Sequence, residues 1–376
     1  MYFRCLKKFN TGMVKPLVLS FICISYAIFS NAQFTVTGRV KDGATQKPLQ
    51  GASVFADNTT LGTTTDADGR YQLWLPKGGY DVSVTFTGYT SESQRVTSND
   101  VTHEYDFTLL PKEKVMEDVA VVSSSEVRDG WQKYGGFFIQ EFIGNTPNAA
   151  ACKILNPEIL KFYFSKKRNR LKVLAAEPLL VENNALGYQI KYALDSFTHE
   201  YNTGISVYTG NPLFKELIAG SDSQYHQWQE ARLHAYRGSM LHFMRSLFNQ
   251  SLSPEGFEIQ FLVKVNGMDS ALKLKNEYAA MHYEKDDSTQ TVGVYPNQNN
   301  VGIIYIKEKP AAPYLNTHPD EPDAFQFSML TFKPGELIVI EQNGYYYDQN
   351  DVSVSQYWAW SRLAESLPYD YSPQGY

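Results

Sequence analysis

The sequence has almost no cysteine. Of its three cysteines, Cys5 and Cys23 fall within the first 32 residues, which leaves Cys152 as the one thiol of the remaining chain. A single thiol forms no internal disulfide, so an oxidising compartment is compatible with this chain but adds nothing to its stability. Cys152 follows the small-residue run 149–151, where we expect a buried structural cysteine and not a nucleophile.

Positive charge is also scarce. The first 32 residues contain four of the 34 Lys and Arg residues and none of the 40 Asp and Glu residues. The rest of the chain therefore has 30 basic and 40 acidic side chains, a net charge of −10. Nucleic acids and anionic membrane surfaces attract basic patches, so neither is expected as a partner.

The N-terminal apolar run is too short to cross a bilayer. Leu17 to Phe29 span 13 residues, whereas a transmembrane helix needs roughly 20. Four basic residues precede this run and Ser-Asn-Ala at 30–32 follows it, which is the pattern of a secretory signal peptide. We expect residues 1–32 to be removed by cleavage before Gln33, with no transmembrane span left; an uncleaved anchor is the alternative.

Familiar catalytic motifs are missing. The sequence contains no Gly-x-Ser-x-Gly, no His-Glu-x-x-His and no phosphate-binding glycine loop, the signatures of large enzyme classes. The His-x-x-Glu spacing of His318 and Glu321 is interrupted by proline, and no later histidine exists to complete a zinc-peptidase site. His226, His234 and His242 recur every eight residues, so on a helix successive rings are rotated by about 80° and cannot share a metal. No catalytic residue, metal ligand or cofactor is therefore predicted.

Aromatic residues, by contrast, are abundant: 26 Tyr and 22 Phe contribute to a total of 14% with Trp. They suit β-rich domains with half-buried faces. Between residues 33 and 112, short alternating apolar runs are separated by Gly, Pro and Asp turns, without room for a crossover helix. This spacing predicts a seven-strand antiparallel β-sandwich. Its alternating runs lie at 34–40, 53–56, 71–75, 80–86 and 101–109.

Five motifs of this region carry a resemblance to a known family. They are Gly-Arg-Val-Lys-Asp at 38–42, Pro-Leu-Gln-Gly-Ala-Ser-Val at 48–54, the run at 62–71 with its Asp-Ala-Asp-Gly-Arg-Tyr ending, Leu-Pro-Lys-Gly-Gly-Tyr at 75–80 and Phe-Thr-Gly-Tyr at 86–89. In this order they resemble the carboxypeptidase-regulatory-like family. The resemblance implies a transthyretin-like sandwich without catalysis, found beside metallocarboxypeptidases and at the N-termini of TonB-dependent transporters and other Gram-negative envelope proteins. Asp66 and Asp68 are interpreted as part of a turn, because the further ligands of an EF-hand are missing.

The rest of the chain is predicted more coarsely. Residues 113–136 are expected to form a linker or an added strand, and residues 137–376 a larger α+β domain of unknown function with one long helix between Ser223 and Leu252. About 250 residues are too few for the plug and 22-strand barrel of a TonB-dependent transporter, which we exclude. A basic turn at 165–169 is interpreted as a solvated hairpin tip. Strands are predicted at 162–164, 170–175, 178–182, 186–194, 205–208, 257–265, 277–282, 301–306, 325–332 and 336–340.

Aromatic residues gather again near the C-terminus. Tyr345 and Tyr346 precede Trp358 and Trp360, which begin a short helix stopped by Pro368. These four aromatic residues are the candidate binding surface, since such rings stack on sugars or anchor a protein partner; packing in the core is the alternative. With the stretches at 178–183 and 235–239, this ending is similar to Gram-negative envelope proteins named for a carboxypeptidase-like regulatory domain, which implies no known activity.

Two functions remain open. The favoured one is an exported, non-catalytic cell-envelope protein, periplasmic, outer-membrane-associated or extracellular in a Gram-negative bacterium, that binds or scaffolds a protein or glycan partner. The alternative is a periplasmic or surface hydrolase, carboxypeptidase-associated or a glycosidase, with an unrecognised site in 137–376. A deep polar pocket with convergent carboxylates or histidines would favour the enzyme. An aromatic surface or an exposed strand edge would favour binding.

Overall fold

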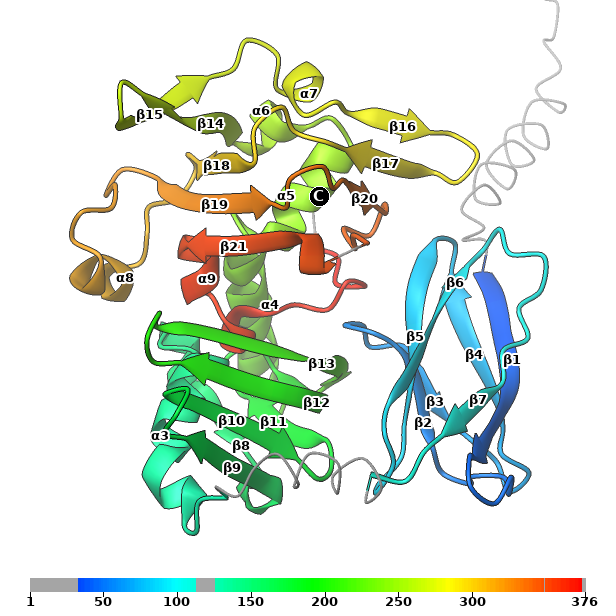
Figure 1. Cartoon of the computed structure of the whole chain (residues 1–376). Helices are drawn as coiled ribbons and strands as arrows, with labels where there is room; N and C mark the ends of the chain where they lie inside the picture. The colour runs from blue at the N-terminus through cyan, green and yellow to red at the C-terminus, as the bar shows by residue number, and fades with distance from the viewer. Residues whose placement is uncertain (1–32, 113–125, 348, 374–376) are drawn as a thin grey trace, which may run out of the picture.

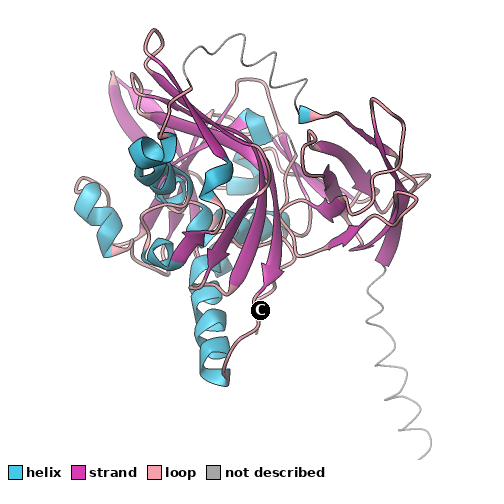
Figure 2. Cartoon of the chain, turned by 90° about the horizontal axis from the view of Figure 1, so that it is seen from below, coloured by secondary structure: helices cyan, strands magenta, loops and turns pink. Residues whose placement is uncertain are grey.

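The computed structural model describes residues 33–112, 126–347 and 349–373. The predicted signal peptide with its cleavage point, and residues 113–125 of the predicted linker, lie outside this part of the chain. A sandwich stands beside a larger region, in which the strands of residues 152–216 lie below the sheets of residues 257–356 (Figure 1). Helices are concentrated in the larger region (Figure 2).

The N-terminal strands form two sheets, with seven strands in all. The sheets have the orders β4-β1-β7 and β3-β2-β5-β6. Neighbouring strands are antiparallel apart from β1 and β7, which run parallel, so the prediction of an antiparallel sandwich needs a correction at this pair. The strands are β1 (Gln33–Asp42), β2 (Ser53–Ala56), β3 (Gly62–Thr64), β4 (Arg70–Pro76), β5 (Gly79–Thr85), β6 (Glu92–Thr97) and β7 (Phe107–Leu109).

Alternation of side chains explains most of this sandwich. In β4, Tyr71, Leu73 and Leu75 are buried while the residues between them are exposed, which confirms the period of two. The strand predicted from the alternating run at 101–109 is too long, because only its last three residues form a strand and Val101 is fully exposed. The reason is the register of β7, whose pairing with β1 runs only from Phe107 to Leu109.

The Asp-Ala-Asp-Gly motif is a turn, as predicted. Oδ1 of Asp66 accepts hydrogen bonds from the backbone N–H groups of Asp68 and Arg70, at 2.9 and 2.8 Å. Gly69 has φ +71°, and a Cβ there would lie 2.5 Å from the carbonyl oxygen of Val40. The motif therefore needs glycine both for its backbone conformation and for this close approach.

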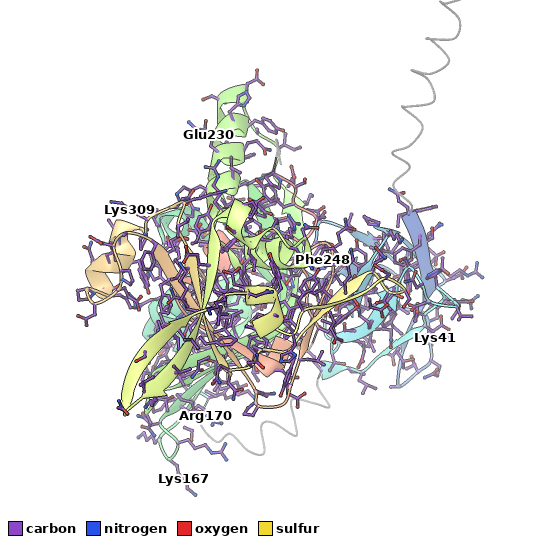
Figure 3. All side chains as sticks on the ribbon, turned by 90° about the horizontal axis from the view of Figure 1, so that it is seen from above. Lys41, Lys167, Arg170, Glu230, Phe248 and Lys309 are labelled. Carbon is purple, nitrogen blue, oxygen red and sulfur yellow. The ribbon has the colours of Figure 1, made fainter. Side chains whose placement is uncertain are left out.

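A six-stranded antiparallel sheet opens the larger region. Its central strand β12 pairs with β11 along its first half, with β10 along its second half, and with β13 along its whole length. The hairpin between β9 and β10 contains the predicted basic turn, and Lys167 projects from its tip away from the body of the protein (Figure 3). The strands are β8 (Cys152–Ile154), β9 (Leu160–Ser165), β10 (Arg170–Ala175), β11 (Leu179–Asn183), β12 (Tyr188–Glu200) and β13 (Ile205–Glu216).

Two further antiparallel sheets complete the larger region. One has five strands in the order β15-β14-β18-β19-β21, and the other has three in the order β16-β17-β20. β21 lies at the end of the five-stranded order, so it is an edge strand. The strands are β14 (Phe257–Val265), β15 (Met268–Lys273), β16 (Glu284–Asp286), β17 (Thr291–Val294), β18 (Asn300–Tyr305), β19 (Gln326–Phe332), β20 (Ile338–Ile340) and β21 (Val352–Gln356).

The long helix predicted between Ser223 and Leu252 is broken in two. Helix α4 ends at Tyr236, Gly238 adopts φ +70°, and Ser239 then caps helix α5 by accepting a hydrogen bond from the backbone N–H of His242. A glycine in the left-handed conformation ends one helix, and the N-cap serine that follows it begins the next. The described α-helices are α3 (Gly130–Phe142), α4 (Asp222–Tyr236), α5 (Met240–Phe248), α6 (Leu252–Glu255), α7 (Glu277–Ala280), α8 (Ala312–Thr317) and α9 (Tyr357–Trp360), with 3-10 turns at Pro147–Ala151, Pro157–Ile159, Gln349–Asp351 and Leu363–Glu365.

Two other predictions of secondary structure were wrong. The strand expected at 277–282 is helix α7, because Asn276 caps it by accepting from the N–H of Ala279 at 3.0 Å. The terminal helix expected from Tyr357 to Pro368 ends already at Trp360. The predicted linker also ends early, since Glu126 forms a β-bridge with Tyr163 and α3 follows at residue 130.

Three buried apolar clusters support these sheets. One fills the sandwich. A second lies between α3, the six-stranded sheet and the C-terminal segment around Leu363. The third lies between α5 and the two upper sheets. Among the described residues, no helix is both long enough and apolar enough to span a membrane.

The sandwich is joined to the larger region through the loop between β2 and β3. Asn58 donates its N–H to the carbonyl of Pro212 at 2.7 Å, and Phe214 donates to the carbonyl of Thr59 at 2.9 Å. Beside this loop, Arg95 of β6 lies 2.8 Å from the carboxylate of Glu341. These contacts define the joint between the two regions.

Candidate functional site

A cavity of about 510 Å³ in the larger region lies between its two groups of sheets. This volume is within the range of about 300–1,000 Å³ that small-ligand pockets occupy. Its wall includes the 3-10 turn after residue 146, the first half of β13, the break between α4 and α5, the turn after β20, and the stretch from β21 to residue 369. Asn58 of the sandwich loop also reaches its wall. We call this cavity the central pocket.

Six tyrosine and tryptophan residues line the central pocket. Trp358 is fixed because its indole N–H donates to the carbonyl of Gly238 at 2.7 Å, across the break between the two helices. The lining aromatics come from β13, from the turn after β20 and from the C-terminal segment: Tyr208, Tyr346, Tyr357, Trp358, Trp360 and Tyr369. Rings of this kind supply apolar area with defined faces for stacking.

The arginine and glutamate side chains that line the central pocket have polar partners. Arg362 lies 2.9 Å from the carboxylate of Glu141, and Glu365 accepts from the side-chain amide of Asn148 at 2.8 Å. Arg237 lies 3.8 Å from the carboxylate of Glu308 beside the pocket. Burial, the largest cause, raises the pKa of the Tyr208 phenol above its usual value, so this phenol stays neutral. The pocket offers stacking surfaces, with an ion-paired arginine and a hydrogen-bonded carboxylate in its wall.

A hydroxyl, an imidazole and a carboxylate do converge beside the central pocket, which invites comparison with a catalytic triad. Ser206 donates its hydroxyl hydrogen to Glu141 at 2.8 Å, and its oxygen lies 2.8 Å from Nδ1 of His199. In a Ser-His-acid triad the imidazole stands between the hydroxyl and the acid and takes the hydroxyl proton. Here the serine stands in the middle, with its proton directed to the carboxylate, so this arrangement is a hydrogen-bonded link between α3 and the sheet.

The four aromatic residues of the predicted binding surface are placed in two different settings. Tyr345 is buried at the joint, where its hydroxyl donates to Asp81 of the sandwich. Tyr346, Trp358 and Trp360 line the central pocket together, the first two almost fully buried and Trp360 partly exposed. The structure therefore brings three of the four together, around a cavity and not on an open surface.

The remaining candidates of the sequence do not form a chemical site. Within residues 33–112, 126–347 and 349–373, no group of three His, Cys, Asp or Glu side chains is placed to hold a metal. His226 and His234 lie on α4, whereas His242 lies on α5 beyond the break. Burial raises the pKa of the Cys152 thiol to about 12, so the nucleophilic thiolate is disfavoured.

Most of the pocket wall is not predictable from the sequence. Asn58, Tyr208 and the C-terminal pair of Arg362 and Glu365 lie at least 150 residues apart in the sequence, and no local pattern links them. One signal was present: glycine followed by serine at 238–239, inside an otherwise helical pattern, predicts a helix break. That break forms one side of the pocket.

Comparison with known proteins identifies the sandwich. Residues 36–121 match the model of the CarboxypepD_reg-like domain. Among curated proteins, "TonB-dependent receptor SusC" of Bacteroides thetaiotaomicron is 34% identical over 117 residues, which cover 31% of this chain and 11% of the receptor. "TonB-dependent receptor P39" of Formosa agariphila is 33% identical over 98 residues, covering 26% of this chain and 9% of the receptor. The chain thus spans about a tenth of the length of these relatives.

Solved structures add no fold assignment for the larger region. The alignment with a DUF3823 family protein from Bacteroides ovatus covers 50% of this chain and 83% of that protein's chain, with 11% identity and a TM-score of 0.18. The family model and the two receptors agree on one part of the sequence, and its seven-strand fold fits them: the N-terminal sandwich of this protein is a CarboxypepD_reg-like domain.

Proposed function

We propose that this chain is an exported, non-catalytic binding protein of the cell envelope. In this proposal the CarboxypepD_reg-like sandwich is a scaffold, and the central pocket of the larger region receives a partner, which is a protein segment or a glycan. The N-terminal signal pattern supports export. The names of the two related receptors support a place in the envelope.

The observation that carries the proposal is the composition of the central pocket. Three predicted aromatic residues meet there with three further aromatic side chains, while Arg362 of the wall is paired with Glu141 and Glu365 accepts a hydrogen bond from Asn148. A catalytic site needs an acid, base or nucleophile directed at the substrate. A binding site needs shape and apolar faces, which this pocket has.

Ligand binding at the pocket can be tested with a bulky substitution at its mouth. Ala359 lines the pocket and is exposed, so Ala359→Trp obstructs the cavity without disturbing the core. Ala279→Trp, at an exposed alanine of α7, is the matched control. Tryptophan fluorescence of the full chain is titrated with a random heptapeptide library and with a panel of envelope oligosaccharides.

We expect saturable binding by at least one pool, at least tenfold weaker in Ala359→Trp and unchanged in Ala279→Trp. The pools are then analysed by mass spectrometry for cleaved products. Absence of any saturable ligand would refute a binding function of this pocket. Turnover that Ala359→Trp abolishes would refute the non-catalytic part and establish the hydrolase.

A further inference from the structure

Strand β13 forms one edge of the six-stranded sheet, and only half of its outer side pairs with another described segment. On its inner side, β13 pairs with β12 from residue 205 to residue 216. On its outer side, the sandwich loop occupies the second half, where Thr59 forms a parallel bridge with Leu213. The hydrogen bonds of this bridge are Asn58 N–H to Pro212 and Phe214 N–H to Thr59. A short extended segment has therefore already been added to this strand from outside.

The direction of these bonds defines the rest of the edge. In an antiparallel ladder, alternate residues direct both their N–H and their C=O to the same side. Pro212 and Phe214 point outward, and Pro212 fits this position because it has no N–H to leave unpaired. The one irregularity of the ladder lies in β12, between Leu194 and Ser196, so the alternation of β13 is continuous. Ser206, Tyr208 and Gly210 therefore direct their backbone groups outward as well.

No described segment pairs with these three outward positions. The backbone hydrogen bonds of the described residues include none from another segment to the N–H or C=O groups of Ser206, Tyr208 or Gly210. Proteins protect free edges with proline, charge or bulges. In β13 the proline and the charged residues are Pro212, Lys215 and Glu216. All three lie in the second half of the strand, where the sandwich loop is attached. The open half has β-branched residues, and Ile205 and Val207 are each 57% exposed.

The open edge borders the central pocket. Ser206 and Tyr208 line the pocket with the side chains that alternate with Ile205 and Val207. A strand added here would send alternate side chains into the pocket and over the exposed apolar residues. The wall opposite includes Val354 of β21, the edge strand of the other sheet.

From this geometry we propose that the ligand of the central pocket is an extended peptide segment of a partner protein, which pairs with β13 at residues 206–210. The segment continues the strand addition that the sandwich loop begins at residues 212–214, and places an apolar or aromatic side chain in the pocket. A row of alternating donors and acceptors matches a peptide backbone, whereas sugar hydroxyls have no such spacing. The inference rests on the proposed binding function and names its ligand class.

Hydrogen exchange of the full chain gives a direct test. The probe is the tightest heptapeptide from a phage-displayed random library selected on the intact protein. We expect bound peptide to slow exchange of the amides of Ser206, Tyr208 and Gly210, which point outward. The amides of Val207 and Thr209 already face β12 and should change little. This alternation is specific to strand addition.

Two substitutions at one position separate the backbone from the side chain. Ser206→Pro removes the outward N–H, and we expect it to weaken peptide binding about tenfold. Ser206→Ala keeps the N–H but loses the hydroxyl with its bonds to Glu141 and His199, so the ratio of the two affinities isolates the backbone N–H, and we expect Ser206→Pro to be the weaker binder. If Ser206→Pro does not fold, the exchange pattern of the unaltered protein decides.

The outcomes are distinguishable. Peptide binding without alternating protection, or insensitive to Ser206→Pro while that variant is folded, would overturn strand addition. Failure of the library together with oligosaccharide binding that Ala359→Trp blocks would overturn the peptide ligand but leave the proposed function intact. Failure of both ligand classes would overturn both proposals.

Discussion

The joint between the sandwich and the larger region contains a carboxyl group whose burial makes stability depend on pH. Asp57 follows β2 and accepts a hydrogen bond from the side-chain amide of Asn211 at 2.6 Å, while its other oxygen is buried with no partner among the described residues. Burial, chiefly, raises its pKa to about 7, and the nearby carboxylates of Asp81 and Asp195 add to the effect. Asp57 is therefore protonated in the folded protein at mildly acidic pH.

The sign and size of the effect follow from linkage. The ordinary pKa is 3.8, so between pH 3.8 and about 7 the unfolded state has lost this proton while the folded state holds it. Over this window the free energy of unfolding falls by about 1.4 kcal/mol per pH unit. The total is about 4 kcal/mol. Above pH 7 both states are ionised, so the loss is complete and the curve is flat.

Asp57→Asn removes this titration and keeps an acceptor for Asn211. We expect the variant to be more stable than the unaltered chain at pH 8, by up to about 4 kcal/mol, and to approach it at pH 4. The measurement is urea unfolding at pH 4 to 8, followed by tryptophan fluorescence, and plotted as the difference between the two proteins. Asp323→Asn removes an exposed carboxyl and serves as the control, with a difference near zero throughout. A difference that does not grow between pH 4 and 7 would refute the buried-carboxyl argument.

Three further predictions test the local structure. Gly238→Ala should destabilise the protein by about 2–4 kcal/mol in urea unfolding. The reason is that φ of Gly238 is +70° and the new Cβ would lie 2.4 Å from Oε1 of Gln326. As a contrast, Gly136 of α3 has open space around its Cβ position, so Gly136→Ala should stabilise the protein by about 0.5–1 kcal/mol. Ser239→Ala removes the cap of α5 and should cost about 1 kcal/mol by the same assay; no loss would contradict the cap. Cys152, with its thiol pKa raised to about 12 by burial, should react slowly with iodoacetamide at pH 8 in the folded chain and rapidly in urea; equal rates would contradict its burial.

The sandwich was predictable because its information is local. Alternating residues such as Tyr71, Leu73 and Leu75 reveal a half-buried strand within seven positions, and glycine turns separate the strands. The run at 101–109 shows the limit of that reasoning, since residues 101–106 alternate in the same way yet meet β1 in an isolated bridge between Glu104 and Thr37 and not in a ladder. Pairing depends on the partner strand, which no local pattern contains.

The central pocket was predictable only in part. The aromatic composition of the C-terminal stretch identified Tyr346, Trp358 and Trp360 as candidates. Their burial in a cavity, however, depends on β13 and on the break between α4 and α5, which lie more than 100 residues away in sequence. The break itself was hidden because apolar residues recur at helical spacing on both sides of Gly238. Helical periodicity reports a buried face and is insensitive to a single left-handed residue.

The attachment of the sandwich loop also has a consequence for the order of folding. All seven sandwich strands lie within residues 33–109, so a chain synthesised from its N-terminus can complete that unit early. Thr60, however, is held by Asp370, 310 positions later, and Tyr369 donates to the carbonyl of Asn58. Closure of these contacts must wait until residues 369 and 370 have been made, since long-range contacts require both partners. Until then the loop is fastened to β13 by Asn58 and Thr59 without the support of the C-terminal segment, so a partly made chain is more exposed to misassociation at this joint.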